Sequence, residues 1–214
     1  MACRASAYVK IGGMNNRAAG EDFYFLQQLA RTVGVEQLAG TMVHPSPRPS
    51  HRVPFGTGRS ISRMQAAGEG EQLFYHPSCF RLLGEWLGLV ADHTDADGRL
   101  ILKLAVELSP SLGEYLDLNR FEDIWGKLRR NNPGRESLLK AFHGWFDGLK
   151  SMKLIHHLAD GPFPRCEPED ALAELFAWGK LAPLSEIEDR LAALRVLQNG
   201  ADTGGRDGIA SPTP

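Results

Sequence analysis

Residues 136–158 read ESLLKAFHGWFDGLKSMKLIHHL and carry the clearest periodic pattern in the chain. Apolar residues recur there at steps of three or four, the spacing that places side chains on one face of an α-helix. They are Leu138, Phe142, Trp145, Leu149, Met152 and Ile155. The spacing therefore predicts one amphipathic helix from Glu136 to Leu158, with its apolar face turned towards a core.

Similar patterns extend upstream of this stretch. A first helix is predicted around an apolar face formed by Leu82, Leu83, Trp86, Leu87 and Val90. Residues 95–98, Asp-Ala-Asp-Gly, are typical of a turn, and Arg99–Leu108 is predicted as the next helix. The segment 112–129 continues the helical spacing. Most of the chain is therefore expected to be helical.

Downstream, the helix boundaries have recognisable end signals. Pro168 suits the first position of a helix, because its missing N–H group needs no partner there, and Gly179 suits the end. Ser185 and Glu188 have the spacing of a capping box for a final helix to about Leu197. Residues 199–214 are rich in Gly, Asp, Thr, Ser and Pro, and are predicted to be a disordered tail.

The overall composition excludes some classes of partner. Lys plus Arg number 24 and Asp plus Glu number 26, so no broad positive field favours nucleic acid. No apolar run approaches the length of about 18 residues that a membrane helix needs. The three cysteines are far apart, which is typical of reduced thiols. The predicted location is the cytoplasm, with attachment to the membrane periphery through a partner left open.

The first 60 residues have a different pattern. Ala7–Ile11 is a short β-favouring run that Gly12 and Gly13 interrupt, which predicts a strand followed by a turn. A helix is predicted from Glu21 to Gly34, with an apolar face formed by Phe23, Leu26, Leu29 and Val33. Residues 37–43 are predicted as a second strand. The predicted fold class is therefore α+β and mostly helical.

A long irregular loop is expected over residues 45–58. Pro45, Pro47 and Pro49 exclude a helix interior or a central strand, because proline fixes φ and lacks an N–H donor. Loops of this length without secondary structure are usually functional or disordered.

The two acidic residues Glu21 and Asp22 are the leading candidates for chemistry. A carboxylate at a helix N-terminus is held ionised by the helix dipole and by free backbone N–H groups. Such a carboxylate can accept the proton of an attacking hydroxyl group, which is general-base catalysis. The alternative is that both residues only stabilise the start of the helix.

Two segments resemble a known family. Residues 12–15, Gly-Gly-Met-Asn, followed by residues 20–23, Gly-Glu-Asp-Phe, are similar to the end of the catalytic domain of family 2 type glycosyltransferases with the GT-A fold. Residues 48–58, RPSHRVPFGTG, resemble a downstream segment in a bacterial subgroup of these proteins. The resemblance covers about residues 3–60 and implies a partial GT-A core there, followed by a helical C-terminal region.

The resemblance assigns roles to several residues. Asp22 would be the catalytic base, with Glu21 beside it, and the turn at Gly12 and Gly13 would shape the acceptor pocket. From guanidinium chemistry, Arg48 and Arg52 are candidates to neutralise a diphosphate leaving group, because a guanidinium can hold phosphate oxygens with two N–H bonds. The alternative is that they belong to the architecture of the loop and pair with nearby carboxylates. A turn with free N–H groups would contribute to the same substrate-binding site, and it comprises Gly56, Thr57 and Gly58.

One part of the family pattern is missing from the chain. Such enzymes bind the nucleotide on an amino-terminal half, with Mn²⁺ or Mg²⁺ held by an Asp-x-Asp motif ahead of the Gly-Gly segment. Only eleven residues precede Gly12, and the later Asp95 and Asp97 are in the wrong order. His44 and His51 are candidate ligands for such a metal in the complete enzyme, and this chain alone is expected to bind none.

These observations lead to two functional hypotheses. In the first, residues 1–60 are the acceptor-side half of a truncated or split glycosyltransferase that transfers a sugar from a nucleotide-diphospho-sugar to a hydroxyl of a glycan. Residues 61–198 are then a helical region, and a partner chain supplies the donor half. In the second, the protein is a noncatalytic helical interaction module that carries a relic transferase segment.

Overall fold

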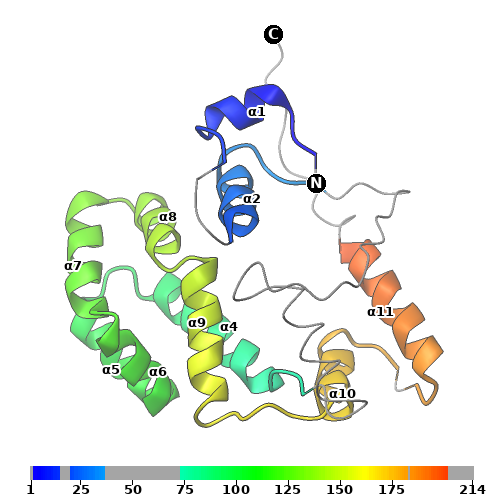
Figure 1. Ribbon diagram of the computed structural model, residues 1–214. Helices are drawn as coiled ribbons and strands as arrows, with labels where there is room; N and C mark the ends of the chain where they lie inside the picture. The colour runs from blue at the N-terminus through cyan, green and yellow to red at the C-terminus, as the bar shows by residue number, and fades with distance from the viewer. Residues whose placement is uncertain (1, 15–19, 37–72, 183, 202–214) are drawn as a thin grey trace. The chain divides into compact units, whose positions relative to one another are not determined.

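The computed structural model describes residues 2–14, 20–36, 73–182 and 184–201. The chain divides into two units, one comprising residues 1–71 and 184–214 and the other residues 72–183. Within the described residues, every regular element is a helix, apart from one isolated bridge between two residues (Figure 1). The prediction of a mostly helical chain is therefore confirmed.

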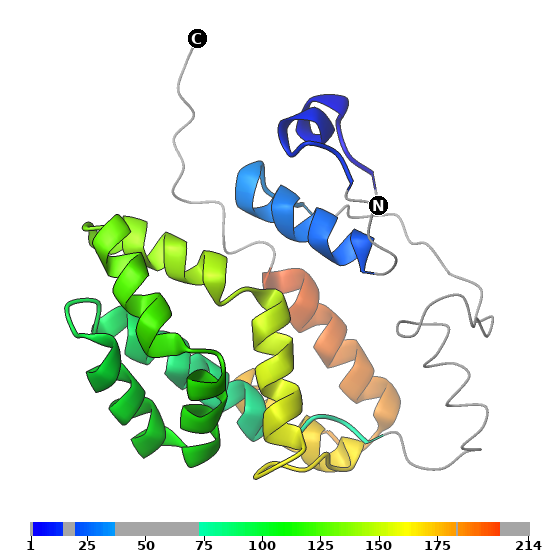
Figure 2. The same ribbon diagram turned by 60° about the vertical axis from the view of Figure 1, so that its left-hand side comes forward.

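The larger unit contains seven helices in chain order. They are α4 (Pro77–Asp92), α5 (Gly98–Leu108), α6 (Pro110–Leu118), α7 (Phe121–Asn131), α8 (Arg135–Trp145), α9 (Gly148–Ala159) and α10 (Pro168–Trp178). Helices α5, α6 and α7 pack against one another, and α4 contacts α5, α9 and α10. Figure 2 shows α9 beside α4 in a second view. The predicted helices around Trp86, over 99–108 and from Pro168 to Gly179 are confirmed.

An aromatic cluster forms the core of this unit. The ring of Trp86, which is fully buried, meets the ring of Phe121 edge-on at a centroid distance of 5.2 Å. Phe142 and Phe146 contact the same indole at 5.9 and 6.0 Å. Edge-to-face pairs of this kind add about 0.5–1.5 kcal/mol each beyond the burial of their area. The cluster therefore joins α4, α7 and α8 through side chains far apart in the sequence.

The single helix predicted from Glu136 to Leu158 is wrong, because the chain forms two helices there. Helix α8 ends at Trp145 and α9 begins at Gly148. The side chain of Asp147 accepts a hydrogen bond from the backbone N–H of Lys150, at 3.0 Å, and so caps α9. Capping of this kind satisfies a donor that the helix itself leaves unpaired. Phe146, next to the break, is buried in the core.

An isolated antiparallel bridge joins the beginning of this unit to a residue near its end. The backbone N–H of Phe74 donates to the carbonyl of Cys166 at 2.8 Å, and the N–H of Cys166 donates back at 3.0 Å. Helices α4 to α9 lie between these two residues in the sequence. The bridge therefore closes a loop of chain that contains most of the unit.

The smaller unit contains α1 (Ala5–Lys10), α2 (Glu21–Thr32) and α11 (Ile187–Ala201). The strand predicted at Ala7–Ile11 is wrong, because these residues mostly belong to α1. Ala5 and Ala7 in α1 favour a helix, which outweighs the β-favouring Tyr8 and Val9 in so short a segment. The predicted helix from Glu21 is confirmed as α2, although the side chains that it buries are Phe25 and Leu29.

Other predictions for this unit have mixed outcomes. The final helix is present and runs to Ala201, beyond the predicted end at Leu197 and into the start of the predicted tail. The predicted strand at 37–43, the proline-rich loop and the rest of the tail lie outside the described residues. The described residues provide no strand for a GT-A core, so that part of the predicted fold class stays without support. No helix within the described ranges is long and apolar enough to cross a membrane.

Candidate functional site

Glu21 and Asp22 form the first turn of α2, as the sequence predicts. The residue before the helix, Gly20, has a left-handed conformation with φ of 74°, and its lack of a side chain leaves the first turn without a side-chain cap. Asp22 is exposed and Glu21 is partly exposed. The site therefore presents two carboxylates in the first turn of a helix, at the positive end of its dipole.

The carboxylate of Asp22 bonds locally. Its Oδ1 atom accepts a hydrogen bond from the backbone N–H of Phe23, at 2.8 Å. Within the described part of the chain, Asp22 forms no ion pair. The other carboxylate oxygen therefore has its lone pairs directed to solvent, in a position to accept a proton or a hydrogen bond from a ligand.

The two glycines Gly12 and Gly13 end helix α1. Both have positive φ values, 76° and 81°, and their N–H groups donate to the carbonyls of Val9 and Tyr8. A Cβ atom on Gly13 would lie 3.2 Å from the ring of Tyr8. That ring also lies 5.8 Å from the ring of Phe25 on α2. The turn is thus packed beside an aromatic pair that joins α1 to α2.

The remaining residues of the predicted substrate and metal sites cannot be placed. They are His44, Arg48, His51, Arg52, Gly56, Thr57 and Gly58, and all lie outside the described residues. Within the described ranges, no group of three or more His, Cys, Asp or Glu side chains could hold a metal ion. Of the predicted site residues, the described ranges therefore include only Gly12, Gly13, Glu21 and Asp22, all in the smaller unit.

The turn at 95–98 confirms its prediction. The side chain of Asp97 accepts a hydrogen bond from the N–H of Leu100, at 2.8 Å, and so caps α5. The backbone carbonyl of Asp95 accepts a bond from the Nη2 atom of Arg129, at 2.9 Å. Asp97 therefore caps the start of α5, and Asp95 contributes a backbone acceptor for Arg129.

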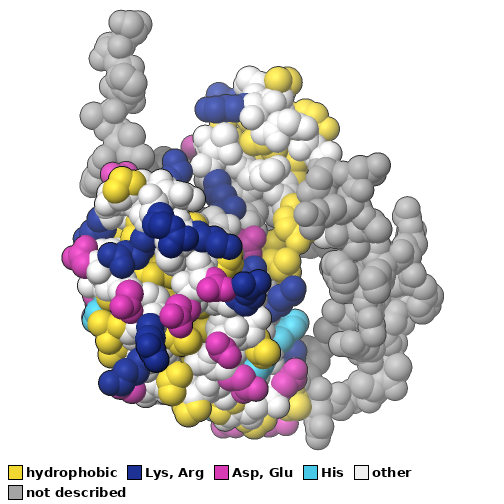
Figure 3. All heavy atoms as spheres, turned by 90° about the vertical axis from the view of Figure 1, so that its left-hand side faces the viewer, with side chains coloured by type: hydrophobic (Ala, Val, Ile, Leu, Met, Phe, Trp, Pro, Cys, Tyr) yellow, Lys and Arg dark blue, Asp and Glu magenta, His cyan; other side chains and the backbone are white. Residues whose placement is uncertain are grey.

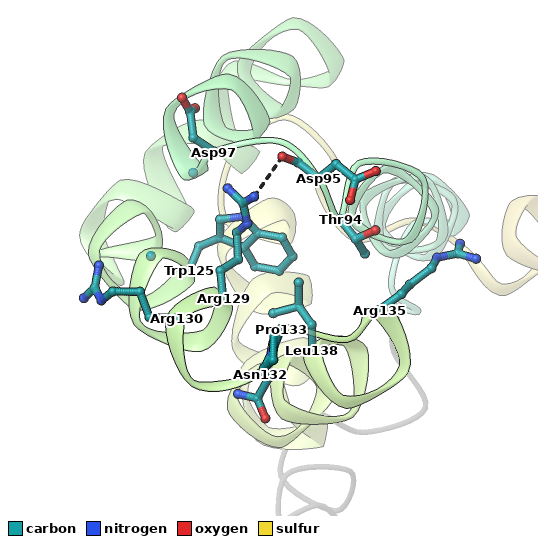
Figure 4. Close-up of a pocket in the computed structure, with 12 residues that line it drawn as sticks. Thr94, Asp95, Asp97, Trp125, Arg129, Arg130, Asn132, Pro133, Arg135 and Leu138 are labelled. Carbon is teal, nitrogen blue, oxygen red and sulfur yellow. Dashed lines mark hydrogen bonds between the residues drawn. The ribbon is translucent and has the colours of Figure 1, made fainter.

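A second candidate site, which the sequence analysis missed, lies in the larger unit. A hollow of about 450 Å³ is bordered by the turn before α5, the end of α7 and the start of α8 (Figure 4). Its lining residues include Arg129, Arg130 and Arg135, and the guanidinium group of Arg129 lies at the centre (Figure 4). The sequence signal was the group of arginines around Asn-Asn-Pro-Gly at 131–134. The turn at 95–98, which completes the hollow, is far away in sequence.

The arginines of this hollow differ in how they are held. Arg129 is half-buried and bonded to the carbonyl of Asp95, whereas Arg130 and Arg135 are exposed. Arg135 donates from Nη2 to the carbonyl of Ala91, at 2.9 Å, near the end of α4. Figure 3 shows Lys and Arg side chains interspersed with Asp and Glu side chains on the face of this unit that carries α7 and α8. The residues that line the hollow include three arginines and two aspartates, so the lining carries an excess of basic side chains on a chain with net charge −2.

Comparison with known proteins identifies no relative. No protein-family model, no curated protein and no solved structure matches the chain. Any functional conclusion therefore depends on the residues themselves, on their geometry and on the local resemblance of residues 12–58.

Proposed function

We propose that the chain is the acceptor-side part of a family 2 type glycosyltransferase, and that Asp22 is its general base. The complete enzyme would transfer a sugar from a nucleotide-diphospho-sugar to a hydroxyl of a glycan. The supporting observation is the presentation of Asp22: an exposed carboxylate, without an ion pair among the described residues, in the first turn of a helix.

The chemistry follows from that presentation. As the acceptor oxygen attacks the anomeric carbon of the donor sugar, its proton passes to the free carboxylate oxygen of Asp22, and the nucleoside diphosphate leaves with the electron pair of the broken bond. Glu21 would be the neighbour of the base in the catalytic pair. The turn at Gly12 and Gly13 would shape the acceptor pocket. Both assignments come from the resemblance of these residues to the family motif.

The nucleotide would bind to a donor half supplied by a partner polypeptide. As the resemblance implies, Mn²⁺ or Mg²⁺ would be held mainly on that half. His44, His51, Arg48 and Arg52, together with the turn at 56–58, remain proposed substrate or metal contacts. The proposed location is the cytoplasm, in free form or at the membrane periphery.

The proposal can be tested on the chain combined with its donor half. Asp22→Asn keeps the shape of the side chain and removes the base, so turnover should fall by about two to four powers of ten, while the KM for the donor stays nearly unchanged. Glu36→Gln is the matched control, because Glu36 is an exposed acid of the same unit outside the motif. The measurement is transfer of radiolabelled sugar from UDP- and GDP-sugars to glycan acceptors.

Two results would contradict the proposal. One is an Asp22→Asn variant that turns over as fast as the Glu36→Gln control. The other is the absence of transfer from every nucleotide sugar when the chain is combined with its donor half.

A noncatalytic helical interaction module is the second candidate function. The observation that favours it is the larger unit, which has its own buried core and contains most of the described residues. In that case the motif at 12–23 would be a relic, and the Asp22→Asn variant would bind every partner of the protein as tightly as the wild type does. Pull-down with the two proteins would measure this directly.

A further inference from the structure

We propose that the hollow between the 95–98 turn and helices α7 and α8 is a binding site for a small phosphorylated molecule, with Arg129 as its principal phosphate ligand. This site belongs to the larger unit, and it is independent of the proposed glycosyltransferase function. Arg129 lies at the centre of the lining residues, and Arg130 and Arg135 extend to either side of it (Figure 4).

The arginines of the hollow keep most of their hydrogen-bond donors available for a ligand. A guanidinium group has five N–H donors in one plane. The structure uses one bond on Arg129, to the carbonyl of Asp95, and one on Arg135, to the carbonyl of Ala91. These bonds fix the direction of each side chain and leave most of its donors for a ligand. Phosphate oxygens match the spacing of two adjacent guanidinium donors.

The positive charges of these arginines are not paired with any carboxylate of the described residues. Within the described residues, none of the three arginines lies within 4.0 Å of a carboxylate oxygen. Two other arginines of the same unit are paired: Arg81 with Glu174 and Arg120 with Asp123. Three arginines and two aspartates line the hollow, and one of those aspartates, Asp97, has its carboxylate occupied by the N–H of Leu100. An anion is the ligand that this imbalance favours.

The N-terminus of α8 lies at the edge of the hollow and also favours an anion there. Gly134, the residue before this helix, provides no side-chain cap, so N–H groups of the first turn have no side-chain acceptor. Free N–H groups at a helix start attract anions, and phosphates most of all. Pro133 and Arg135, on either side of Gly134, both line the hollow. The helix start thus adds to the field of the arginines.

A purely structural role is the alternative. The bonds of Arg129 and Arg135 also connect α7 and α8 to the end of α4 and the turn after it. If that were their only role, replacing them would lower the melting temperature without any ligand effect, because no anion would bind to the wild-type protein. Ligand binding and stability must therefore be measured on the same variants.

The test is calorimetric titration of the full chain with sodium phosphate and sodium diphosphate at low ionic strength. Both anions should bind, diphosphate more tightly, and Arg129→Gln should weaken diphosphate binding by a factor of about ten or more, the loss of a charged hydrogen-bonded contact. Arg130→Gln removes an exposed residue without a bond in the structure and should weaken binding about two- to fivefold without unfolding the protein. Arg129→Lys should fall between the wild type and Arg129→Gln.

Lys127→Gln is the matched control. Lys127 is an exposed cation of the same helix, α7, that does not line the hollow, so its loss should leave the affinity within about twofold of the wild type. Vesicles of phosphatidylcholine with phosphatidic acid distinguish the source of the phosphate. Binding to them as well as to free diphosphate assigns the site to lipid headgroups, and binding to diphosphate alone assigns it to soluble esters. The proposal is overturned if phosphate, diphosphate and the vesicles all fail to bind, or if Lys127→Gln and Arg130→Gln weaken binding equally.

Discussion

The hydroxyl of Tyr115 on α6 donates a hydrogen bond to the backbone carbonyl of Lys150 on α9, across 2.9 Å. Tyr115 is buried, with 6% of its surface exposed. Burial raises the pKa of this phenol to about 12, and the negative charge of Asp147 adds to the effect. The folded protein therefore holds the proton of Tyr115 at a pH at which the unfolded chain releases it.

The free energy of unfolding depends on pH through this phenol. The raised pKa means that Tyr115 contributes its full stability below the unfolded value of 10, and that this contribution is lost as the pH rises from 10 to about 12. In urea unfolding, the free energy should fall more steeply over that interval in the wild type than in Tyr115→Phe. Equal slopes for the two proteins would contradict the environment described for this phenol.

Gly98 should not tolerate a side chain, whereas Gly84 should. A Cβ atom on Gly98 would lie 3.0 Å from the backbone Cα and carbonyl oxygen of Glu122, so α5 and α7 would have to separate. Gly98→Ala should lower the free energy of unfolding by about 1–3 kcal/mol. Gly84 is exposed on α4 with open space around it, so Gly84→Ala should raise that free energy by about 0.5–1 kcal/mol. Urea unfolding monitored by circular dichroism measures both, and two changes of the same sign would contradict this packing.

The two fully buried tryptophans should respond differently to replacement by phenylalanine. The Nε1 atom of Trp125 donates to the carbonyl of Ala96, at 3.0 Å, whereas the Nε1 atom of Trp86 has no partner among the described residues. Trp125→Phe leaves that carbonyl without its donor and should cost about 1–3 kcal/mol more than Trp86→Phe. The comparison requires urea unfolding curves of both variants, and a larger loss for Trp86→Phe would contradict it.

The aspartates of the 95–98 turn differ in their effect on stability. Asp97→Ala removes the cap of α5 and should lower the free energy of unfolding by about 0.5–2 kcal/mol. Asp95→Ala is the control, because its carboxylate accepts no bond in the structure and only its backbone carbonyl is used. A loss for Asp95→Ala as large as that for Asp97→Ala would show that the cap is not the stabilising contact.

The sequence predicted much of the larger unit because its helices bury regularly spaced apolar residues. Leu82, Trp86 and Val90 are buried on α4, as their spacing indicates. The break before Gly148 was missed because the apolar spacing from Phe142 to Ile155 continues across it. Asp147 followed by Gly148 was the local signal for a new helix start, since aspartate favours the capping position.

The smaller unit and the basic hollow were less predictable, for two physical reasons. The β-favouring run at Tyr8 and Val9 is too short for periodicity to distinguish a strand from a helix. The hollow requires Asp95 and Arg129 to meet, and only the packing of α5 against α7 brings these residues together. By contrast, the helix start at Glu21 and Asp22 is a local feature, which the sequence located correctly.

The two hydrogen bonds between Phe74 and Cys166 hold the two ends of the segment 75–165 close together. Residues that exchange both backbone bonds in this manner have Cα atoms about 5.5 Å apart, so the chain enters and leaves helices α4 to α9 at almost the same point. A linker of a few glycines would be long enough to join Phe74 to Cys166 if residues 75–165 were removed. Residues 75–165 therefore begin and end beside each other, and α4 within them also contacts α10, which follows them in the chain.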